Sequence, residues 1–148
     1  MIGDMLSIDN SIGISLTETW LSDEICDAEV HIDGYDNFRA DRLNRMRGGT
    51  SIYMTTDLNC KLVNTFSNSV VEIVIVTCKN LDTLSISVYW PPSTSNNEWK
   101  QGVDFIMNNV ELSQAHGNYG RIVMSGDFNF PSLEWKNNRT KTDFYLNS

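Results

Sequence analysis

The fold of this chain is decided by one stretch of sequence, RIVMSGDFNFP, which occupies residues 121–131. Its apolar residues 122–124 are followed closely by an acid, an aromatic, an amide and a proline. This pattern predicts a buried strand whose end presents polar groups at the surface. Because side chains alternate faces along extended backbone, we expect Asp127 and Asn129 on one face and Phe128 on the other. The alternative is a strand followed by an Asx turn, in which the two polar side chains satisfy only local backbone donors.

A second acid follows another predicted strand. Ile12, Ile14 and Leu16 alternate with small residues, and Glu18 continues that alternation. A regular strand would point Glu18 inward, where a buried carboxylate needs a cation, several hydrogen bonds or a metal. Either a pair with a later arginine or a site shared with Asp127 meets that need, because a sheet can bring two strand ends side by side.

Composition limits the class of protein. With 148 residues, 41% hydrophobic and 10% aromatic, the chain is expected to form one globular domain over residues 1–148. No apolar run is long enough for a membrane span and no secretory signal is visible, so we expect an intracellular protein. Three widely spaced cysteines exclude a disulfide scaffold and argue against a zinc site. The net charge of −8 has the wrong sign for a nucleic-acid binder but suits a site that collects a divalent cation.

Two further features bear on function. A local basic patch comes from four arginines within nine residues, namely Arg39, Arg42, Arg45 and Arg47. This patch either binds phosphate or is simply a solvated surface. Tyr89 ends a predicted strand just before two prolines, and its hydroxyl either contacts a phosphate oxygen or only reaches water from the core. One helix is predicted from Asn96 or Asn97, with an apolar stripe that covers a sheet.

These residue types together are suited to phosphate ester chemistry. Magnesium prefers carboxylate oxygens and keeps several waters, so one or two protein acids are enough to hold it. The arginines and Tyr89 would hold the phosphate, the metal would neutralise charge on its oxygens, and an acid would orient the attacking water. Gly126 is expected to leave room for whatever approaches Asp127. Phosphodiester hydrolysis is the chemistry that this set favours.

Several segments also resemble a known family, the endonuclease/exonuclease/phosphatase superfamily. More narrowly, the chain from about Ser11 onward resembles the endonuclease domain that precedes reverse transcriptase in non-LTR retrotransposons. The resemblance implies an α/β (α+β) fold, a four-layer sandwich of two packed mixed β-sheets flanked by helices. The segments that carry it, in family order, are TETWL at 17–21, FRADR at 38–42 followed by Gly48-Gly49, VYWPP at 88–92 and GDFNFP at 126–131.

The resemblance also implies roles for individual residues. Glu18 is the expected metal ligand, joined by Asp127, and Tyr89 contacts the scissile phosphate. Asp127 orients or deprotonates the attacking water, while Asn129 binds the phosphate and helps to position that acid. The implied cofactor is Mg²⁺, with Mn²⁺ as a substitute. The implied partners are DNA, which is nicked, and a reverse transcriptase domain of the same polyprotein, acting in the nucleus and not at a membrane.

The sequence departs from the family at three points. Residues 1–10 contain no convincing copy of the strand that carries a metal-site asparagine, and no Ser-Asp-His segment follows Asp127. Trp90 stands where the family has arginine after the tyrosine. We therefore expect an incomplete sandwich, weak or inactive by itself. Two alternatives stay open: a superfamily phosphoesterase acting on inositol phosphates, sphingolipid headgroups or RNA, and a non-catalytic relic of the fold.

Overall fold

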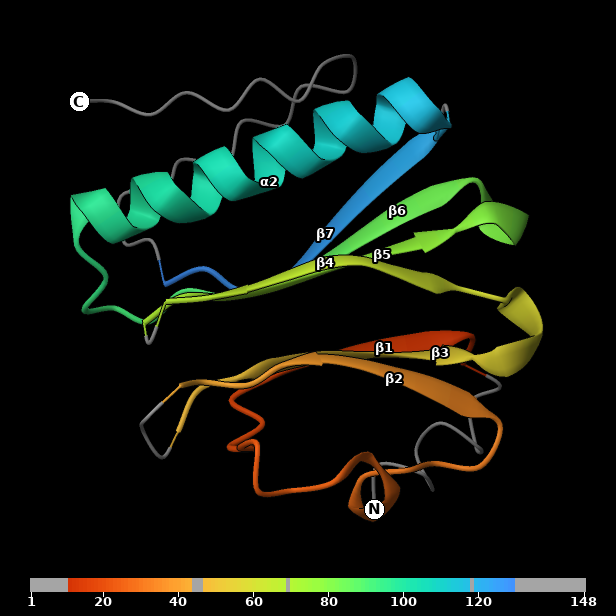
Figure 1. The fold of residues 1–148 in the computed structure, drawn as a ribbon, viewed down its shortest axis with the longest axis horizontal. Helices are drawn as coiled ribbons and strands as arrows, with labels where there is room; N and C mark the ends of the chain where they lie inside the picture. Colours follow the sequence, from red (N-terminus) through yellow and green to blue (C-terminus); the bar gives the residue numbers. More distant parts are fainter. Residues whose placement is uncertain (1–10, 44–46, 69, 118, 130–148) are drawn as a thin grey trace.

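The computed structural model describes residues 11–43, 47–68, 70–117 and 119–129 (Figure 1). This part of the chain contains seven strands, one α-helix and three short 3-10 turns. Among these residues, no helix combines the length and the apolar character that crossing a membrane requires. The strands are β1 (Gly13–Thr17), β2 (Tyr35–Ala40), β3 (Thr50–Thr55), β4 (Lys61–Ser67), β5 (Glu72–Cys78), β6 (Thr83–Tyr89) and β7 (Arg121–Asp127). The helix is α2 (Asn96–His116), and the 3-10 turns are η1 (Asp27–Glu29), η2 (Thr56–Leu58) and η3 (Lys79–Leu81).

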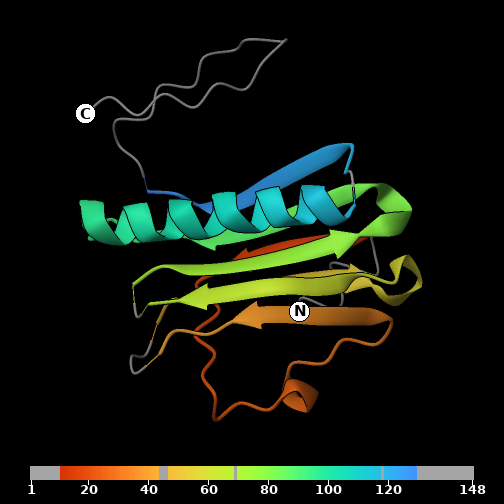
Figure 2. The same ribbon diagram turned by 45° about the horizontal axis from the view of Figure 1, so that its top comes forward.

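The strands form two sheets that pack face to face (Figure 1). One sheet has the order β1-β3-β2 and is antiparallel throughout. The other has the order β4-β5-β6-β7 and is mixed, because β7 runs parallel to β6 while the other pairs are antiparallel. Helix α2 lies along the outer face of the four-stranded sheet, as the turned view also shows (Figure 2). The predicted α/β sandwich of two packed sheets is confirmed.

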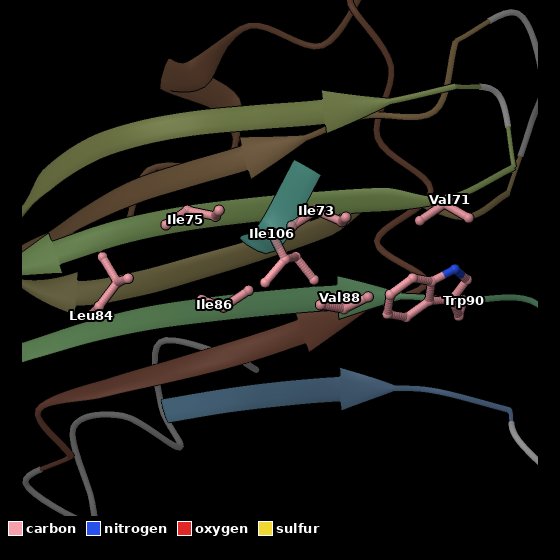
Figure 3. Close-up of a cluster of buried hydrophobic side chains, with 8 residues drawn as sticks. All are labelled: Val71, Ile73, Ile75, Leu84, Ile86, Val88, Trp90 and Ile106. Atoms are coloured by element: carbon pink, nitrogen blue, oxygen red, sulfur yellow. The ribbon is translucent and has the colours of Figure 1, made fainter. Parts of the chain in front are cut away.

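Strand β5 separates two hydrophobic cores, because its alternate side chains serve opposite faces of the sheet. Ile73 and Ile75 face α2 and pack with aliphatic side chains of β6 and with Ile106 of the helix (Figure 3). Val74 and Val76 face the three-stranded sheet and pack on its inner side chains. All four are fully buried. The nearly continuous β-branched run of β5 therefore suits its place inside the sheet, where both faces of the strand are covered.

Helix α2 begins where the sequence indicates. Ser95 is its N-cap: the hydroxyl accepts from the Glu98 backbone N–H, while the Glu98 carboxylate accepts from the Ser95 backbone N–H at 2.8 Å. Gly102 allows the helix to pack closely on the sheet, since a Cβ there would lie 2.8 Å from the Trp90 ring. His116 occupies the last turn and its Nδ1 lies 2.7 Å from the Leu112 carbonyl oxygen, which is helix-ending chemistry.

Three hydroxyl groups connect the two sheets. Ser87 of β6 is fully buried and hydrogen-bonds to Ser15 of β1 at 2.7 Å and to Thr50 of β3. Thr50 also donates to the Leu16 carbonyl at 3.0 Å. Buried hydroxyl groups are costly unless they are paired, so this hydroxyl cluster favours one relative position of the sheets. It lies two residues from the end of β6, where Tyr89 stands.

A buried ion pair fixes the same end of the sandwich. Glu72, the acidic exception in the apolar run of β5, has no exposed surface. Arg42 donates to both of its carboxylate oxygens, from Nε at 2.8 Å and from Nη2 at 3.0 Å, and the Gly49 N–H adds a third bond at 3.3 Å. Arg42 Nη2 also donates to the Val70 carbonyl at 2.6 Å. Burial raises the pKa of Glu72, and the Arg42 guanidinium and the Gly49 N–H oppose that rise.

Replacing Arg42 with methionine is expected to destabilise the fold by about 3–5 kcal/mol at neutral pH, because an unpaired carboxylate stays buried. Urea unfolding followed by circular dichroism measures this loss. The pKa of Glu72 rises further without its cation. The penalty is therefore largest at high pH and shrinks as the pH falls toward 4.5, the ordinary value for the carboxyl, because the protonated acid needs no cation.

The double variant Arg42→Met, Glu72→Leu is the matched control, because it removes both charges and keeps the volume apolar. It should recover most of the lost stability and lose the pH dependence. An equally large loss in the double variant would show that packing, and not an orphaned charge, causes the effect.

Candidate functional site

Glu18 follows β1 at a turn in the backbone. The φ angles of Glu18 and Trp20 are 56° and 57°, in the left-handed region, and the Trp20 N–H donates to the Gly48 carbonyl at 2.9 Å. The strand alternation therefore stops at Thr17. The expectation that Glu18 is buried is wrong: the residue is exposed, because this turn carries it out of the strand.

The Glu18 carboxylate is nevertheless held by three donors. The Tyr89 hydroxyl donates to Oε1, and Oε2 accepts from Trp20 Nε1 at 2.6 Å and from the Gly48 N–H at 3.1 Å. Within the described residues it makes no ion pair with an arginine. Of the possibilities that the sequence left open, this part of the structure contains the one in which several hydrogen bonds satisfy the acid.

Tyr89 ends β6 and connects Glu18 to the opposite sheet. Its neighbours in register are Glu72 on β5 and Asp127 on β7. Residues directly paired across strands present their side chains on the same face, so these three form a row on the inner face of the four-stranded sheet. Tyr89 is 5% exposed, and the Arg42 guanidinium lies 5.2 Å from the centre of its ring. The structure therefore brings Glu18, Tyr89 and Asp127 to one end of the sandwich.

Asp127 and Asn129 form a local turn. The Asn129 N–H donates to Asp127 Oδ1 at 3.2 Å, and Asn129 Nδ2 donates to the Trp90 carbonyl at 3.0 Å. Asn129 has a φ of 42°, so strand alternation ends before it, and the Asx turn considered from the sequence is present. Phe128 packs on the α2 side of the sheet, opposite Asp127, as the alternation predicts. Half-buried Asp127 thus has one oxygen fixed by the backbone and makes no ion pair among the described residues.

Of the three predicted patch arginines that the structure describes, two are held by internal partners. Arg42 is committed to Glu72, and Arg39 lies 3.3 Å from both the Asp27 and Asp41 carboxylates and donates to the Ile25 carbonyl at 2.6 Å. The assignment of Arg39 and Arg42 to substrate is therefore revised, because internal partners hold both guanidinium groups. Arg47 is exposed and lies over the Trp20 ring, and Arg45 lies outside the described residues.

Gly126 is required for a different reason than its sequence context indicates. Its φ is 137°, and a Cβ there would lie 1.9 Å from the Val88 carbonyl oxygen of the neighbouring strand. The glycine therefore allows β7 to approach β6 just before Asp127, and it does not mainly provide space for an incoming group. The close approach fixes the backbone from which the Asp127 side chain extends.

Several contacts of the site were not predicted from the sequence. Gly48 and Gly49 donate consecutive N–H groups to two different carboxylates, those of Glu18 and Glu72. Both glycines have positive φ angles, and a Cβ at Gly48 would overlap the Arg42 guanidinium. The only signal in the sequence is the glycine doublet itself, which indicates unusual backbone but not its partners.

Comparison with known proteins identifies the fold. No protein-family model matches the sequence, and no curated protein matches it either. Solved structures do match. The ANGEL2 structure, described as a 2′,3′-cyclic phosphatase, has a TM-score of 0.61 at 16% identity, covering 88% of this chain and 43% of that one.

Two other solved structures agree. The human Nocturnin catalytic domain with a bound sulfate anion has a TM-score of 0.56 at 15% identity, over 90% of this chain and 56% of that one. D. rerio TDP2 complexed with single strand DNA product has a TM-score of 0.55 at 12% identity, over 88% and 53%. The chain shares the fold of these three structures. The chain spans about half the length of these structures.

The described residues contain no group of three or more His, Cys, Asp or Glu side chains that could together hold a metal ion. The residues present therefore do not fit zinc or a calcium cage, which require several protein ligands. A cation that keeps most of its water, such as Mg²⁺, needs only one or two protein carboxylates, and exposed Glu18 and half-buried Asp127 are the acids that could supply them at this end of the sandwich.

Gly126→Ala is expected to destabilise the chain by roughly 2–4 kcal/mol, since it adds both backbone strain and overlap with Val88. Urea unfolding measures the change. Gly117→Ala is the matched control, because the same added methyl group meets nothing nearer than the Tyr119 hydroxyl at 3.9 Å and its φ of −177° suits any residue. Equal effects from the two substitutions would refute the steric explanation for Gly126.

Proposed function

We propose that this chain is the catalytic part of a magnesium-dependent phosphodiesterase, with Glu18, Tyr89 and Asp127 at its centre. One observation carries the proposal: a hydrogen bond from Tyr89 to Glu18 joins two sheets, and the Tyr89 register partner is Asp127. Glu18, Tyr89 and Asp127 therefore lie at one end of a sandwich whose fold is shared with ANGEL2, a 2′,3′-cyclic phosphatase. This combination supports hydrolysis of a phosphate ester.

Glu18 is the proposed ligand for Mg²⁺, which Mn²⁺ can replace. Oε2 is already fixed by Trp20 and Gly48, whereas Oε1 accepts only from the Tyr89 hydroxyl within the described residues. The oxygen on the Tyr89 side is therefore the one proposed to bind the cation. When bound, the cation supplies positive charge that stabilises the developing charge on the phosphoryl oxygens.

The remaining residues carry the rest of the proposed mechanism. Asp127 orients the attacking water and accepts its proton, with Asn129 holding the acid from the backbone side. The Tyr89 hydroxyl donates to a phosphoryl oxygen in place of Glu18. Arg47 is the proposed cation for the substrate backbone, since Arg39 and Arg42 are held internally. The Asn129 amide group is proposed to position Asp127 more than to bind the phosphate, because its Nδ2 donates to the Trp90 carbonyl.

The proposed substrate is DNA, which the enzyme nicks to leave a 3′-hydroxyl. The order of the segments around Glu18, Arg42, Tyr89 and Asp127 supports a retrotransposon endonuclease, whose reverse transcriptase domain extends that end. The nucleus is then the proposed place of action. A matched solved structure, D. rerio TDP2, holds a single strand DNA product, which supports nucleic acid as the substrate class.

A supercoiled-plasmid assay tests this function. We expect slow nicking that requires Mg²⁺ or Mn²⁺ and stops in EDTA. Asp127→Asn should lower the rate about 10²–10⁴-fold, as the loss of a positioned general base does. Glu18→Gln should weaken binding of Mn²⁺, followed by its electron paramagnetic resonance signal, by about tenfold or more. Nicking that persists in EDTA or in either variant would contradict metal-assisted catalysis.

A non-catalytic relic is the second candidate, and one observation favours it. Three donors already satisfy the Glu18 carboxylate without any cation. In that case the wild-type chain neither nicks DNA nor binds Mn²⁺. Release of inorganic phosphate from a soluble inositol phosphate, or cleavage of RNA but not DNA, would instead indicate another substrate for the same site.

A further inference from the structure

We propose that Trp20 and Arg47 form a stacking platform that holds one unpaired base of a single-stranded nucleic acid beside the Glu18–Tyr89 pair. This inference rests on the proposed function for the identity of the neighbouring site. It adds a base-binding role for Trp20, to which the proposed chemistry gives no contact with substrate, beside the proposed contact of Arg47 with the substrate backbone. Here "platform" means the exposed face of the Trp20 indole together with the Arg47 guanidinium.

The Trp20 ring is exposed and yet held in place. It is 62% exposed, the highest value among the large apolar side chains of the described residues. Its Nε1 donates to Glu18 Oε2 at 2.6 Å, so the edge of the ring is fixed while its surface faces solvent. The residue also adopts a φ of 57°, a conformation that non-glycine residues adopt at a cost. Such a pre-organised aromatic surface loses little conformational entropy when it binds a flat partner.

Arg47 completes the platform with a positive charge. Its guanidinium carbon lies 5.7 Å from the centre of the Trp20 ring, within the range of a cation–π interaction. Unlike Arg39 and Arg42, it makes no ion pair with a carboxylate among the described residues. It is therefore available to a phosphate, while the indole is available to a base. An aromatic surface next to an arginine is the combination used to bind single strands.

Glu18 connects this platform to the candidate site. Trp20 Nε1 and the Tyr89 hydroxyl donate to the two oxygens of the same carboxylate. A base on the indole and a phosphate at Tyr89 therefore belong to neighbouring positions of one strand. The platform would therefore do more than raise the affinity, because the base that it holds determines which phosphate of the strand lies at Tyr89.

The surface favours unpaired bases over a duplex. In a duplex each base is stacked on its neighbours, so its face is not free to meet an indole. The chain has a net charge of −8, so attraction to the phosphate backbone is weak overall and stacking must supply a larger share of the affinity. We therefore expect binding that depends on bases more than on phosphates.

Fluorescence anisotropy in EDTA tests the platform without cleavage. The probes are a short labelled single-stranded DNA, an oligomer of equal length whose sugars lack bases, and a duplex. Wild-type protein should bind the single strand about tenfold more tightly than either of the others, and Trp20→Ala should bind the single strand and the abasic oligomer equally. Trp20→Phe should keep most of the preference, because it keeps a ring and loses only the bond to Glu18.

Arg47→Ala should weaken binding of both oligomers and reduce the dependence on salt. Leu112→Ala is the matched control: this side chain is 59% exposed on α2, and its loss should change nothing. Circular dichroism confirms that each variant is folded. Equal affinity of the wild type for the single strand and the abasic oligomer, or an unchanged preference in folded Trp20→Ala, would overturn the inference.

The two proposals fail separately. Base-dependent binding without any nicking would support the platform and contradict the proposed phosphodiesterase activity. Metal-dependent nicking without base-dependent binding would support the phosphodiesterase activity and contradict the platform.

Discussion

The ion pair between Arg42 and Glu72 is the constraint on which this end of the molecule depends. A carboxylate with no exposed surface must have its charge compensated, and here the compensation comes from a residue just beyond β2 and from the backbone of Gly49. The pair therefore ties the segment after β2 to the first residue of β5. The same guanidinium lies over the Tyr89 ring, so the cation that balances a structural charge also supports a residue of the candidate site.

The backbone of Gly48 and Gly49 connects the buried Glu72 carboxylate to Glu18. Because Gly49 donates to Glu72, its neighbour Gly48 is held where it donates to Glu18. A residue with a side chain at Gly48 would overlap Arg42 and would also need a φ near 84°. Two consecutive peptide groups thus connect the buried Glu72 carboxylate to the Glu18 carboxylate of the candidate site.

Much of this was readable from the sequence, and the exceptions have physical causes. The alternation of Ile12, Ile14 and Leu16 predicted β1, and the helix predicted from Asn96 or Asn97 begins at Asn96, because these signals are local. The sequence also predicted that Glu18 and Asp127 each follow a strand, and both acids do, at the ends of β1 and β7. The partners of the arginines were not foreseen. Arg42 lies thirty residues from Glu72, and no local pattern encodes a contact of that kind. The left-handed backbone at Glu18 and Trp20 was missed as well, because neither residue type favours it.

Glu18 directly follows β1 of one sheet, whereas Tyr89 and Asp127 are the last residues of β6 and β7 in the other. The dimensions of the candidate site are therefore set by the gap between two stiff layers. That gap is set in turn by the aliphatic side chains packed within it, such as Ile52 and Val74, and by the hydroxyl cluster around Ser87. The packing of these interior residues thus determines how far the Glu18 carboxylate lies from the Tyr89 hydroxyl. A substitution that adds or removes one methylene group in this layer would therefore change the distance between Glu18 and Tyr89 without replacing either residue.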